Sequence, residues 1–396
     1  MQTFIGIDWA SDKHDICALA PDGRLLGQFI ISHDIAGFQQ LQSYLLTCDE
    51  IVIAIERPNG LLVEFLLEHS WDLRCVTPNV TAARRPRRHK SDLSDAYLLA
   101  NMLRMNDIEC RPIIRDSQLV MNLKQMTQAH LQLLAERTRL SNQLHYALKQ
   151  YYPALLKVFC KLAQPLTLTF LQHYPSPDDA QALSLEDLRL FLKSQNYSHM
   201  RRLQSIYEML QEPTQRSEAQ AGYIQHMLSL TVILRAIVDE VVRLERELVT
   251  LFKQHPEADW WLQFPGLGAV NAARLLARIG DNRQNFKSAN ELRAVAGTVP
   301  ITQHSGQRKR VLFRRSCSHV LRKAFYDLAM KSKPKCDWAK TYYKEQIKRG
   351  HNKPRANRAL SNRWAGIIWK LWKTRENYDE KIHVANQQRH KQALVA

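Results

Sequence analysis

The chain has 396 residues, 45% of them hydrophobic, which is enough for two or three domains with substantial cores and excludes a disordered polyelectrolyte. Its 56 Lys and Arg outnumber 38 Asp and Glu, and the formal net charge of +18 favours a polyanionic partner, nucleic acid before membrane. No apolar run is long enough to span a bilayer, and the N-terminus lacks a signal-peptide layout. The seven cysteines are scattered and form no CxxC pair, which favours reduced thiols over a zinc finger. We therefore expect a cytoplasmic protein.

Residues 1–112 alternate strand-like and helix-like segments. FIGIDWA is an apolar run with an Asp inside it, and two β-rich runs follow around the turn tripeptide Pro21-Asp22-Gly23. Helical IAGFQQLQSYLL, the buried-type strand EIVIAIERP, helical LLVEFLLEHS and the strand DLRCVTPN come next. This order predicts an α/β domain that starts with an antiparallel hairpin.

The segment HKSDLSDAYLLANML, residues 89–103, closes this first domain with a predicted helix. Leu99 and Met102 form an apolar seam on one side of this helix. Asp95 lies four residues before Leu99 and Asp92 three residues before Asp95, so both acids lie on the same side as the seam. A carboxylate that faces the core costs several kcal/mol unless a counter-charge meets it. One reading is that the nearby Arg84, Arg85, Arg87, Arg88 and Lys90 pair with these acids.

Two further acids interrupt apolar strands of the same domain. Asp8 lies inside FIGIDWA and Glu56 ends IVIAIE, and each alone is explained as a strand-end residue that faces water. Together with Asp92 and Asp95 they gather negative charge from two strands and a helix. Hard divalent cations bind such oxygen ligands, and a pair of them can clamp the attacking and leaving oxygens of a phosphodiester. We therefore predict an Mg²⁺ (or Mn²⁺) site on these four acids.

Residues 113–256 form a predicted helical linker domain with two long seams. The first has apolar residues at 119, 123, 126, 133, 140, 144 and 147, broken by His130 and Arg137. The second is Leu230, Leu234, Ile237, Val241, Leu244, Leu248 and Leu251. Such seams make either an antiparallel hairpin within one chain or a coiled coil between chains, and both alternatives stay open here.

Residues 257–373 are predicted to be helical and are very basic. Between 307 and 373, twenty Lys and Arg face only three acids, so this segment holds most of the charge excess. Nine aromatics lie among the cations: Phe313, Phe325, Tyr326, Trp338, Tyr342, Tyr343, Trp364, Trp369 and Trp372. Cations with stacking surfaces suit a nucleic-acid groove, and the alternative is a solvated basic face over an aromatic core. Residues 374–396 are expected to be a polar, frayed tail.

Two short motifs lie in this basic part. Gly266 and Gly268 of FPGLGAVNAARLL precede a helix whose backbone N–H groups can meet a phosphate, as in helix-hairpin-helix proteins; the alternative is a plain interhelical turn. Ser305-Gly306 follows Pro300 and lies beside Arg308, Lys309 and Arg310; taken alone, such a pair is usually a turn.

The element order and the acids resemble the ribonuclease-H-like fold of RuvC-like Holliday-junction resolvases. More specifically, the chain resembles the DEDD transposases of bacterial insertion sequences, the family numbered one hundred and ten. That family carries G-I-D-x-(A/S)-x-x-x-H, then E, then K-(S/T)-D-x-x-D-A, and this chain has GIDWASDKH, AIERPNG and HKSDLSDA. The resemblance implies that Asp8, Glu56, Asp92 and Asp95 are catalytic metal ligands.

The resemblance also bears on Ser305. The family's second domain has A-G-L-V-P followed by S-G, whose serine is the proposed nucleophile; Gly297, Val299, Pro300, Ser305 and Gly306 match, with Thr298 in place of Leu. The family's K-x-G-N-x-x-L-R is RRSCSHVLR here, without Gly-Asn. The metals would polarise the phosphate and help to activate Ser305, and Arg308 and Arg310 would stabilise the transition state.

The expected function is therefore an Mg²⁺-dependent transposase or recombinase that rejoins DNA through a serine–phosphate intermediate. The resemblance implies a structured guide RNA, a homo-oligomer and association with the bacterial nucleoid. One alternative is a hydrolytic, RuvC-like, structure-specific DNA endonuclease that uses the four acids alone. The other is a non-catalytic, basic coiled-coil protein that binds nucleic acid. The expected nucleic-acid contacts are Arg84, Arg85, Arg87, Arg88, Lys90, Gly266, Gly268, Arg308, Lys309, Arg310, Arg314 and Arg315.

Overall fold

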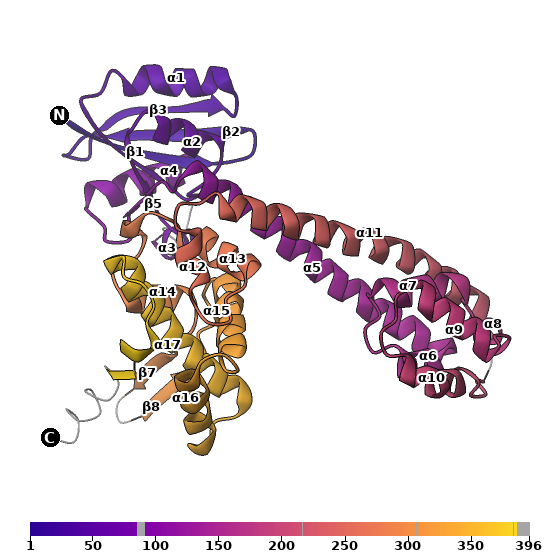
Figure 1. Cartoon of the computed structure of the whole chain (residues 1–396). Coiled ribbons are helices and arrows are strands. Elements are labelled where there is room, and N and C mark those ends of the chain that lie inside the picture. The colour runs from indigo at the N-terminus through magenta and orange to yellow at the C-terminus, as the bar shows by residue number, and fades with distance from the viewer. Residues whose placement is uncertain (85–91, 216, 306–307, 383, 386–396) are drawn as a thin grey trace. The chain divides into compact units, whose positions relative to one another are not determined.

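A computed structural model describes residues 1–84, 92–215, 217–305, 308–382, 384 and 385 (Figure 1). The chain divides into two compact units, Met1–Arg115 and Asp116–Ala396. Within the described ranges, no helix combines the length and apolar character needed to cross a membrane.

The first unit is a mixed sheet with helices, as the element order predicts. Its elements are β1 (Gln2–Trp9), β2 (Lys13–Leu19), β3 (Leu25–Ser32), α1 (Ile35–Leu45), β4 (Glu50–Ile55), α2 (Leu61–Glu68), β5 (Asp72–Cys75), α3 (Pro78–Arg84), α4 (Asp92–Arg104) and β6 (Arg111–Pro112). The strand order is β3-β2-β1-β4-β5-β6. β1, β2 and β3 form an antiparallel meander, whereas β4 runs parallel to β1 and β5 parallel to β4. Only α3 and the short β6 lie outside the predicted elements.

Strand alternation gives this sheet two buried faces. Ile5 and Ile7 of β1 share a core cluster with residues of α1 and α2. Phe4, together with Ala54 of β4, belongs to a second cluster with α4. Gly6 lies on the α4 face, where an added Cβ would be only 1.9 Å from the carbonyl oxygen of Ala96. A glycine at this position therefore allows α4 to lie directly on β1.

The second unit is almost entirely helical. Its distal part has α5 (Gln118–Tyr151), α6 (Pro153–Val158), α7 (Pro165–His173), α8 (Pro177–Gln181), α9 (Leu185–Ser194), η1 (Met200–Arg202), α10 (Leu203–Leu210) and α11 (Gln220–Lys253). Its C-terminal part has α12 (Ala258–Leu262), α13 (Ala269–Ile279), η2 (Arg283–Asn285), α14 (Ala289–Val295), β7 (Ile301–Ser305), β8 (Arg308–Leu312), α15 (His319–Ser332), α16 (Asp337–Lys348) and α17 (Lys353–Thr374). The hairpin of β7 and β8 interrupts a segment predicted to be wholly helical.

The two long helices α5 and α11 pack against each other within one chain (Figure 1). Leu123 shares a core cluster with Leu248, whereas Leu144 shares another with Leu230. Residue numbers on α11 thus fall as those on α5 rise, so the pair is antiparallel. The buried residues of α11 follow the predicted seam except that Val238 and Phe252 replace Ile237 and Leu251, because a straight helix drifts from an exact seven-residue repeat.

The aromatic residues of the basic segment mostly form the core of the second unit. Phe325, Trp364 and Trp372 are fully buried, and Trp338 is 5% exposed. Tyr342, Tyr343 and Trp369 pack partly buried against the same cluster. The prediction of a stacking surface is therefore wrong for these residues, and the alternative of an aromatic core describes them.

The first residues of the predicted tail are also ordered by packing. The Tyr378 hydroxyl accepts a hydrogen bond from Trp338 Nε1 at 2.8 Å, and the Tyr378 backbone N–H donates to Gln263 Oε1 at 2.8 Å. The Glu380 carboxylate accepts from the Asp337 backbone N–H at 3.1 Å. The expectation that fraying starts at residue 374 is therefore wrong. It was based on the polar composition of this segment, whereas Tyr378 packs against the core of the second unit.

Candidate functional site

Asp8 and Glu56 are adjacent at the carboxyl ends of two parallel strands. The register of β1 and β4 pairs Ile7 with Ile55, and Asp8 and Glu56 are the next residue on each strand. By alternation both follow the α4 face, two residues after Gly6 and Ala54. The sheet thus brings together two of the four predicted acids.

Helix α4 adds Asp95 to the same face. Leu99 is fully buried and Met102 is 4% exposed, as the predicted seam requires, and Asp95 is only 4% exposed. Asp95 precedes Ala96, whose carbonyl oxygen contacts the Gly6 position on β1. The prediction of an inward-facing Asp95 is therefore confirmed. Asp92 opens α4, but its side chain lies outside the part of the chain that the structure describes.

A fifth acid, Asp15, was missed by the sequence reasoning. It is the cross-strand partner of Asp8 in the antiparallel register of β1 and β2, and it is 2% exposed. Directly opposed like charges are unfavourable unless cations or hydrogen bonds compensate them. Asp8, Asp15 and Asp95 each have a polar or electrostatic partner in the fold. The available signal was the alternation of the hairpin, which places residues 8 and 15 on one face.

The orientation of Glu56 depends on a buried hydroxyl. The Thr81 hydroxyl of α3 donates to Glu56 Oε1, and Thr81 is 1% exposed. The Cys75 thiol lies 3.5 Å from the Glu56 carbonyl oxygen, and burial, with the neighbouring Glu56 charge, raises the pKa of this thiol to about 11. Nothing in the sequence marks Thr81, since threonine in a short helix has no specific meaning.

These carboxylates fit a hard divalent cation by their donor atoms. The set is all oxygen, which Mg²⁺ and Mn²⁺ prefer. Among the side chains that the structure describes, no group of three or more His, Cys, Asp and Glu has the arrangement of a metal site. Because the side chain of Asp92 lies outside the described part of the chain, the four-acid set stays a prediction.

On the opposite face of the sheet, which α1 and α2 cover, a second cluster lies at the same end of β1. Arg57 follows Glu56 in the sequence, and Trp9 follows Asp8. The guanidinium carbon of Arg57 lies 3.9 Å from the ring centroid of Trp9. His14 is fully buried, and its Nε2 lies 2.7 Å from Nδ1 of His33. Burial and, to a lesser extent, the neighbouring His33 lower the pKa of His14 to about 4. His14 is therefore neutral at pH 7 and supports the end of β1 as a packed polar residue.

The basic residues before α4 are only partly placed. Arg84 forms an ion pair with Asp107, whose side chain is 7% exposed. The other four predicted contacts in this stretch, Arg85, Arg87, Arg88 and Lys90, lie outside the described residues. Nucleic-acid binding by this stretch stays a prediction.

In the second unit, Ser305 ends strand β7 of the antiparallel hairpin. The register pairs Ser305 with Arg308 and Gln303 with Arg310. Arg308 and Arg310 are exposed, whereas the side chains of Ser305 and Lys309 are not among those described. The hairpin therefore places the backbone of the predicted nucleophile opposite Arg308 in the adjacent strand.

Two more predicted contacts follow the hairpin. Arg314 is half-buried, and its Nε donates to the Val299 carbonyl oxygen at 3.3 Å, whereas Arg315 is exposed. Thr298, which replaces the family's Leu, is 8% exposed, and its hydroxyl lies 3.2 Å from both the Arg293 carbonyl oxygen and Asn362 Oδ1. The polar replacement is therefore satisfied by hydrogen bonds.

The two glycines of the PGLG turn have different roles. Gly266 has φ +84, and an added Cβ would lie 2.5 Å from the backbone of Lys331, so this glycine lets the turn pack on the end of α15. Gly268 begins α13 and has no atom within 4 Å of the position of an added Cβ. Only Gly268 thus has the open space that approach of a phosphate requires.

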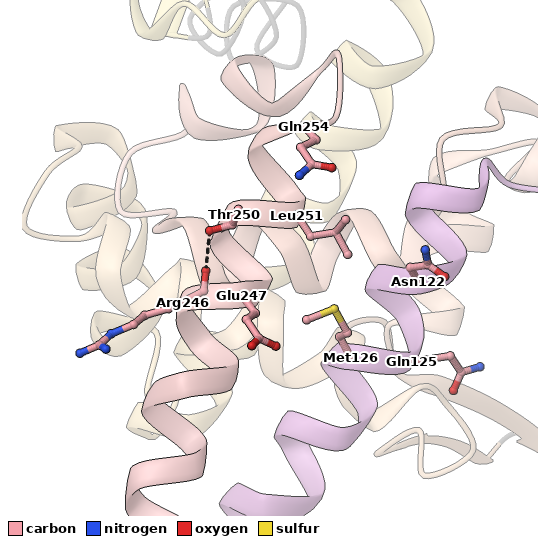
Figure 2. A pocket seen from close by; sticks show the side chains of 8 residues that line it. All are labelled: Asn122, Gln125, Met126, Arg246, Glu247, Thr250, Leu251 and Gln254. Atoms are coloured by element: carbon pink, nitrogen blue, oxygen red, sulfur yellow. Dashed lines mark hydrogen bonds between the residues drawn. The ribbon is translucent and has the colours of Figure 1, made fainter.

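A groove of about 580 Å³ lies between α5 and α11 (Figure 2). Met126 of α5 and Leu251 of α11 provide its apolar side chains, and amide groups such as Gln254 surround them. The Thr250 hydroxyl donates to the Arg246 carbonyl oxygen at 3.0 Å within the groove. No predicted catalytic residue lines it, so we do not place the chemistry there.

Comparison with known proteins matches the two regions that hold these residues. Residues 5–153 match a family model of DEDD transposases, and residues 261–344 match the model described as "Transposase IS116/IS110/IS902 family". The chain is 31% identical over 399 residues to the IS117 mini-circle protein of Streptomyces coelicolor, an alignment that covers 96% of both chains.

Two more distant relatives have the same extent. The 42 kDa protein of insertion element IS900 from Mycobacterium paratuberculosis is 25% identical, over 92% of this chain and 94% of its own. The transposase for insertion sequence element IS1328 from Yersinia enterocolitica is 22% identical, over 93% of this chain and 96% of its own. The chain therefore belongs to the IS116/IS110/IS902 family of transposases.

Proposed function

We propose that this transposase cleaves and rejoins DNA with two sets of groups: the carboxylates of the first unit and Ser305 of the second. The observation that carries the proposal is the register that places Asp8 beside Glu56 under the N-terminal half of α4. A mixed sheet with an antiparallel start followed by parallel strands supports a ribonuclease-H-like fold for this unit.

Four acids, Asp8, Glu56, Asp92 and Asp95, would hold Mg²⁺ or Mn²⁺. A divalent ion bound there supplies Lewis-acid polarisation of a phosphate and lowers the pKa of a coordinated hydroxyl. The chain itself fixes the ligands: Glu56 is oriented by Thr81, and Asp95 is held by the packing of α4 on β1. Asp15 lies opposite Asp8 on β2, on the same face of the sheet, and would add a further carboxylate beside the site.

The covalent step uses Ser305. Its hydroxyl loses a proton as the oxygen forms a bond to phosphorus, the bond between phosphorus and the leaving deoxyribose oxygen breaks, and that oxygen gains a proton. A hydroxyl of a second DNA strand then displaces Ser305 and restores a phosphodiester. Arg308 and Arg310, exposed on the hairpin, supply positive charge for the transition state.

The remaining parts of the proposal concern partners. The excess of basic residues in the C-terminal part supports binding to DNA and to a structured guide RNA. The long antiparallel helices offer a surface for assembly into a homo-oligomer, although their main seam is already buried within one chain.

The test is to incubate the protein with Mg²⁺, RNA transcribed from the flanks of the element, and donor and target DNA. We expect a DNA adduct on the peptide that contains Ser305, identified by mass spectrometry, which Ser305→Ala removes. Cleavage that continues undiminished in Ser305→Ala would instead identify a nuclease that uses water. Binding of DNA and RNA by the wild type without any Mg²⁺-dependent cleavage or adduct would leave only nucleic-acid binding.

A further inference from the structure

The hairpin of β7 and β8 is a small element with exposed side chains. Val311 is 60% exposed, Leu312 41% and Phe313 45%. A two-stranded ribbon of five residues a side is only marginally stable by its own pairing. The position of the hairpin must therefore be set by contacts at its base, where the chain enters at Val299 and leaves at Arg314.

The two ends of the hairpin are tied together by backbone acceptors. Arg314 Nε donates to the Val299 carbonyl oxygen at 3.3 Å. Further out, the Ser318 backbone N–H donates to the Val295 carbonyl oxygen at 2.7 Å, which joins the start of α15 to the end of α14. These two hydrogen bonds join the segment that enters the hairpin to the segment that leaves it. Their donors and acceptors all belong to those two segments.

Arg322 of α15 is the residue that fastens this base to a helix. Its Nη2 donates to the Arg314 carbonyl oxygen, and its guanidinium carbon lies 4.4 Å from the ring centroid of Phe313. Its Nε is buried and has no hydrogen-bond partner among the described atoms, so a phosphate does not reach it. The planar guanidinium thus contacts two consecutive residues at the end of the hairpin.

Gly297, just before the hairpin, accommodates the same guanidinium. Its φ is +61, and an added Cβ would lie 2.7 Å from Arg322 Nη2 and 2.9 Å from Arg322 Nε. The Cys317 sulfur would lie 2.6 Å away. Arg322 therefore lies against the backbone of the segment that enters the hairpin and also bonds to the segment that leaves it.

Arg358 of α17 offers a natural comparison. Its guanidinium carbon lies 4.9 Å from the centroid of the same Phe313 ring. The three atoms nearest to the position of an added Cβ at Gly297 belong to Cys317 and Arg322, not to Arg358, and the described residues show no hydrogen bond from Arg358 to Arg314. Removal of either arginine takes one cation from Phe313, but only Arg322 joins both ends of the hairpin.

We propose that Arg322 is a positioning residue that holds the Ser305 hairpin in the geometry needed for attack on DNA, and that Gly297, which its positive φ also favours, leaves room for the guanidinium. The proposal rests on the proposed role of Ser305 as nucleophile. Misplacement of a reacting group by about 1 Å can cost about 100-fold in rate. A rate effect of this size, without weaker DNA binding, is what distinguishes positioning from a phosphate contact.

The experiment compares Arg322→Lys, which keeps the charge but loses the planar fork, with Arg358→Lys as the matched control. Two quantities are measured on each full-length variant: the single-turnover rate of the Ser305–DNA adduct at saturating DNA, and the Kd for that DNA. Hydrogen exchange of the backbone amides of residues 301–312 is followed in parallel. Gly297→Ala provides an independent disturbance of the same contact.

We expect Arg322→Lys and Gly297→Ala to lower the adduct rate by about 100-fold, with Kd within about threefold of wild type and faster exchange confined to the hairpin. Arg358→Lys should change neither rate nor exchange. A weaker Kd with a normal rate at saturation would overturn the proposal in favour of a phosphate contact, as would unchanged exchange in both variants. If the wild type forms no Ser305 adduct, the proposed function fails, and hydrogen exchange alone still decides whether Arg322 holds the hairpin.

Discussion

The two regions that carry the predicted chemistry are built in opposite ways. In the first unit, Asp8 and Glu56 lie at the ends of central strands and Asp95 on the helix that covers them, and burial on both faces of the sheet fixes the strand register. Asp95 and Asp15 are almost fully buried. In the second unit, Ser305 ends a two-stranded hairpin whose neighbours are largely exposed. The acids thus belong to a rigid scaffold, whereas the serine belongs to an element held mainly at its base.

This difference fits the two proposed roles. Carboxylates that hold a cation must keep their relative positions in every step, and a packed sheet provides that precision. A nucleophile that joins one DNA end and then releases it to another must reach a large substrate, which an exposed hairpin allows. Substitutions in the first unit should therefore act through metal and packing, and those in the hairpin through rate and DNA contact.

The largest effect is expected at Asp8. Asp8→Asn keeps the size of the side chain but removes the charge that a divalent cation requires, so we expect strand cleavage to fall by about 1,000-fold. The measurement is the single-turnover cleavage rate as a function of Mg²⁺ concentration. Asp12→Asn, an exposed acid in the following turn, is the control and should remain within about twofold of wild type. Equal rates for both variants would remove Asp8 from the site.

A packing change should come next in size. Gly6→Ala would place a Cβ 1.9 Å from the Ala96 carbonyl oxygen and 2.5 Å from the Ala100 nitrogen, so α4 must move off β1. We expect the first unit to lose about 3 kcal/mol of unfolding free energy, measured by urea denaturation. Gly222→Ala, at a helical position with no atom within 4 Å, should instead stabilise α11 by about 1 kcal/mol.

Acid should weaken the first unit through His14. The folded pKa is lowered to about 4 from the ordinary value of 6.5, so the unfolded chain binds a proton that the folded chain excludes. Stability is thus complete above pH 6.5 and falls as the pH drops toward 4, by at most about 1.4 kcal/mol per pH unit. Hydrogen exchange of β1–β3 amides at several pH values measures this slope. His14→Gln should flatten it, and an unaltered slope would assign the pH dependence elsewhere.

The smallest effect concerns nucleic-acid contact by the hairpin. Arg310→Ala should weaken DNA binding and reduce the slope of log K against log salt concentration by about one, because one phosphate contact is lost. Arg243→Ala is the control, since this arginine pairs with Glu240 and Glu247 on α11. A slope that does not distinguish the two variants would place DNA away from the hairpin.

The first unit could be predicted from sequence to a large extent because its patterns have a single physical meaning. Alternation within FIGIDWA identifies a buried face, and so do the steps of four residues from Asp95 to Leu99 and of three from Leu99 to Met102. Asp15 follows from the same alternation once Asp8 and Asp15 are recognised as cross-strand partners. Thr81 could not be found this way, because its contact with Glu56 depends on the fold of α3.

The second unit was less predictable because its patterns are ambiguous. The seams of α5 and α11 suit partners in the same chain or in another, and only contacts such as His130 with Glu245, at 3.1 Å, place the pair within one chain. The high density of Lys and Arg in this segment led to two wrong predictions: that it is wholly helical, without the short strands β7 and β8, and that its aromatic side chains are exposed. Arg322 matches the final Arg of the family's K-x-G-N-x-x-L-R segment, but its contacts with Phe313 and with the Gly297 position could not be read from that match.

One measurement tests most directly whether carboxylates and serine serve one reaction. DNA adducts on the full-length protein are mapped by mass spectrometry, with and without Mg²⁺, for the wild type and for Asp8→Asn. A Mg²⁺-dependent adduct on Ser305 that Asp8→Asn suppresses is the predicted result. An adduct at another residue, or one that forms equally well without Asp8 or without the ion, would contradict it.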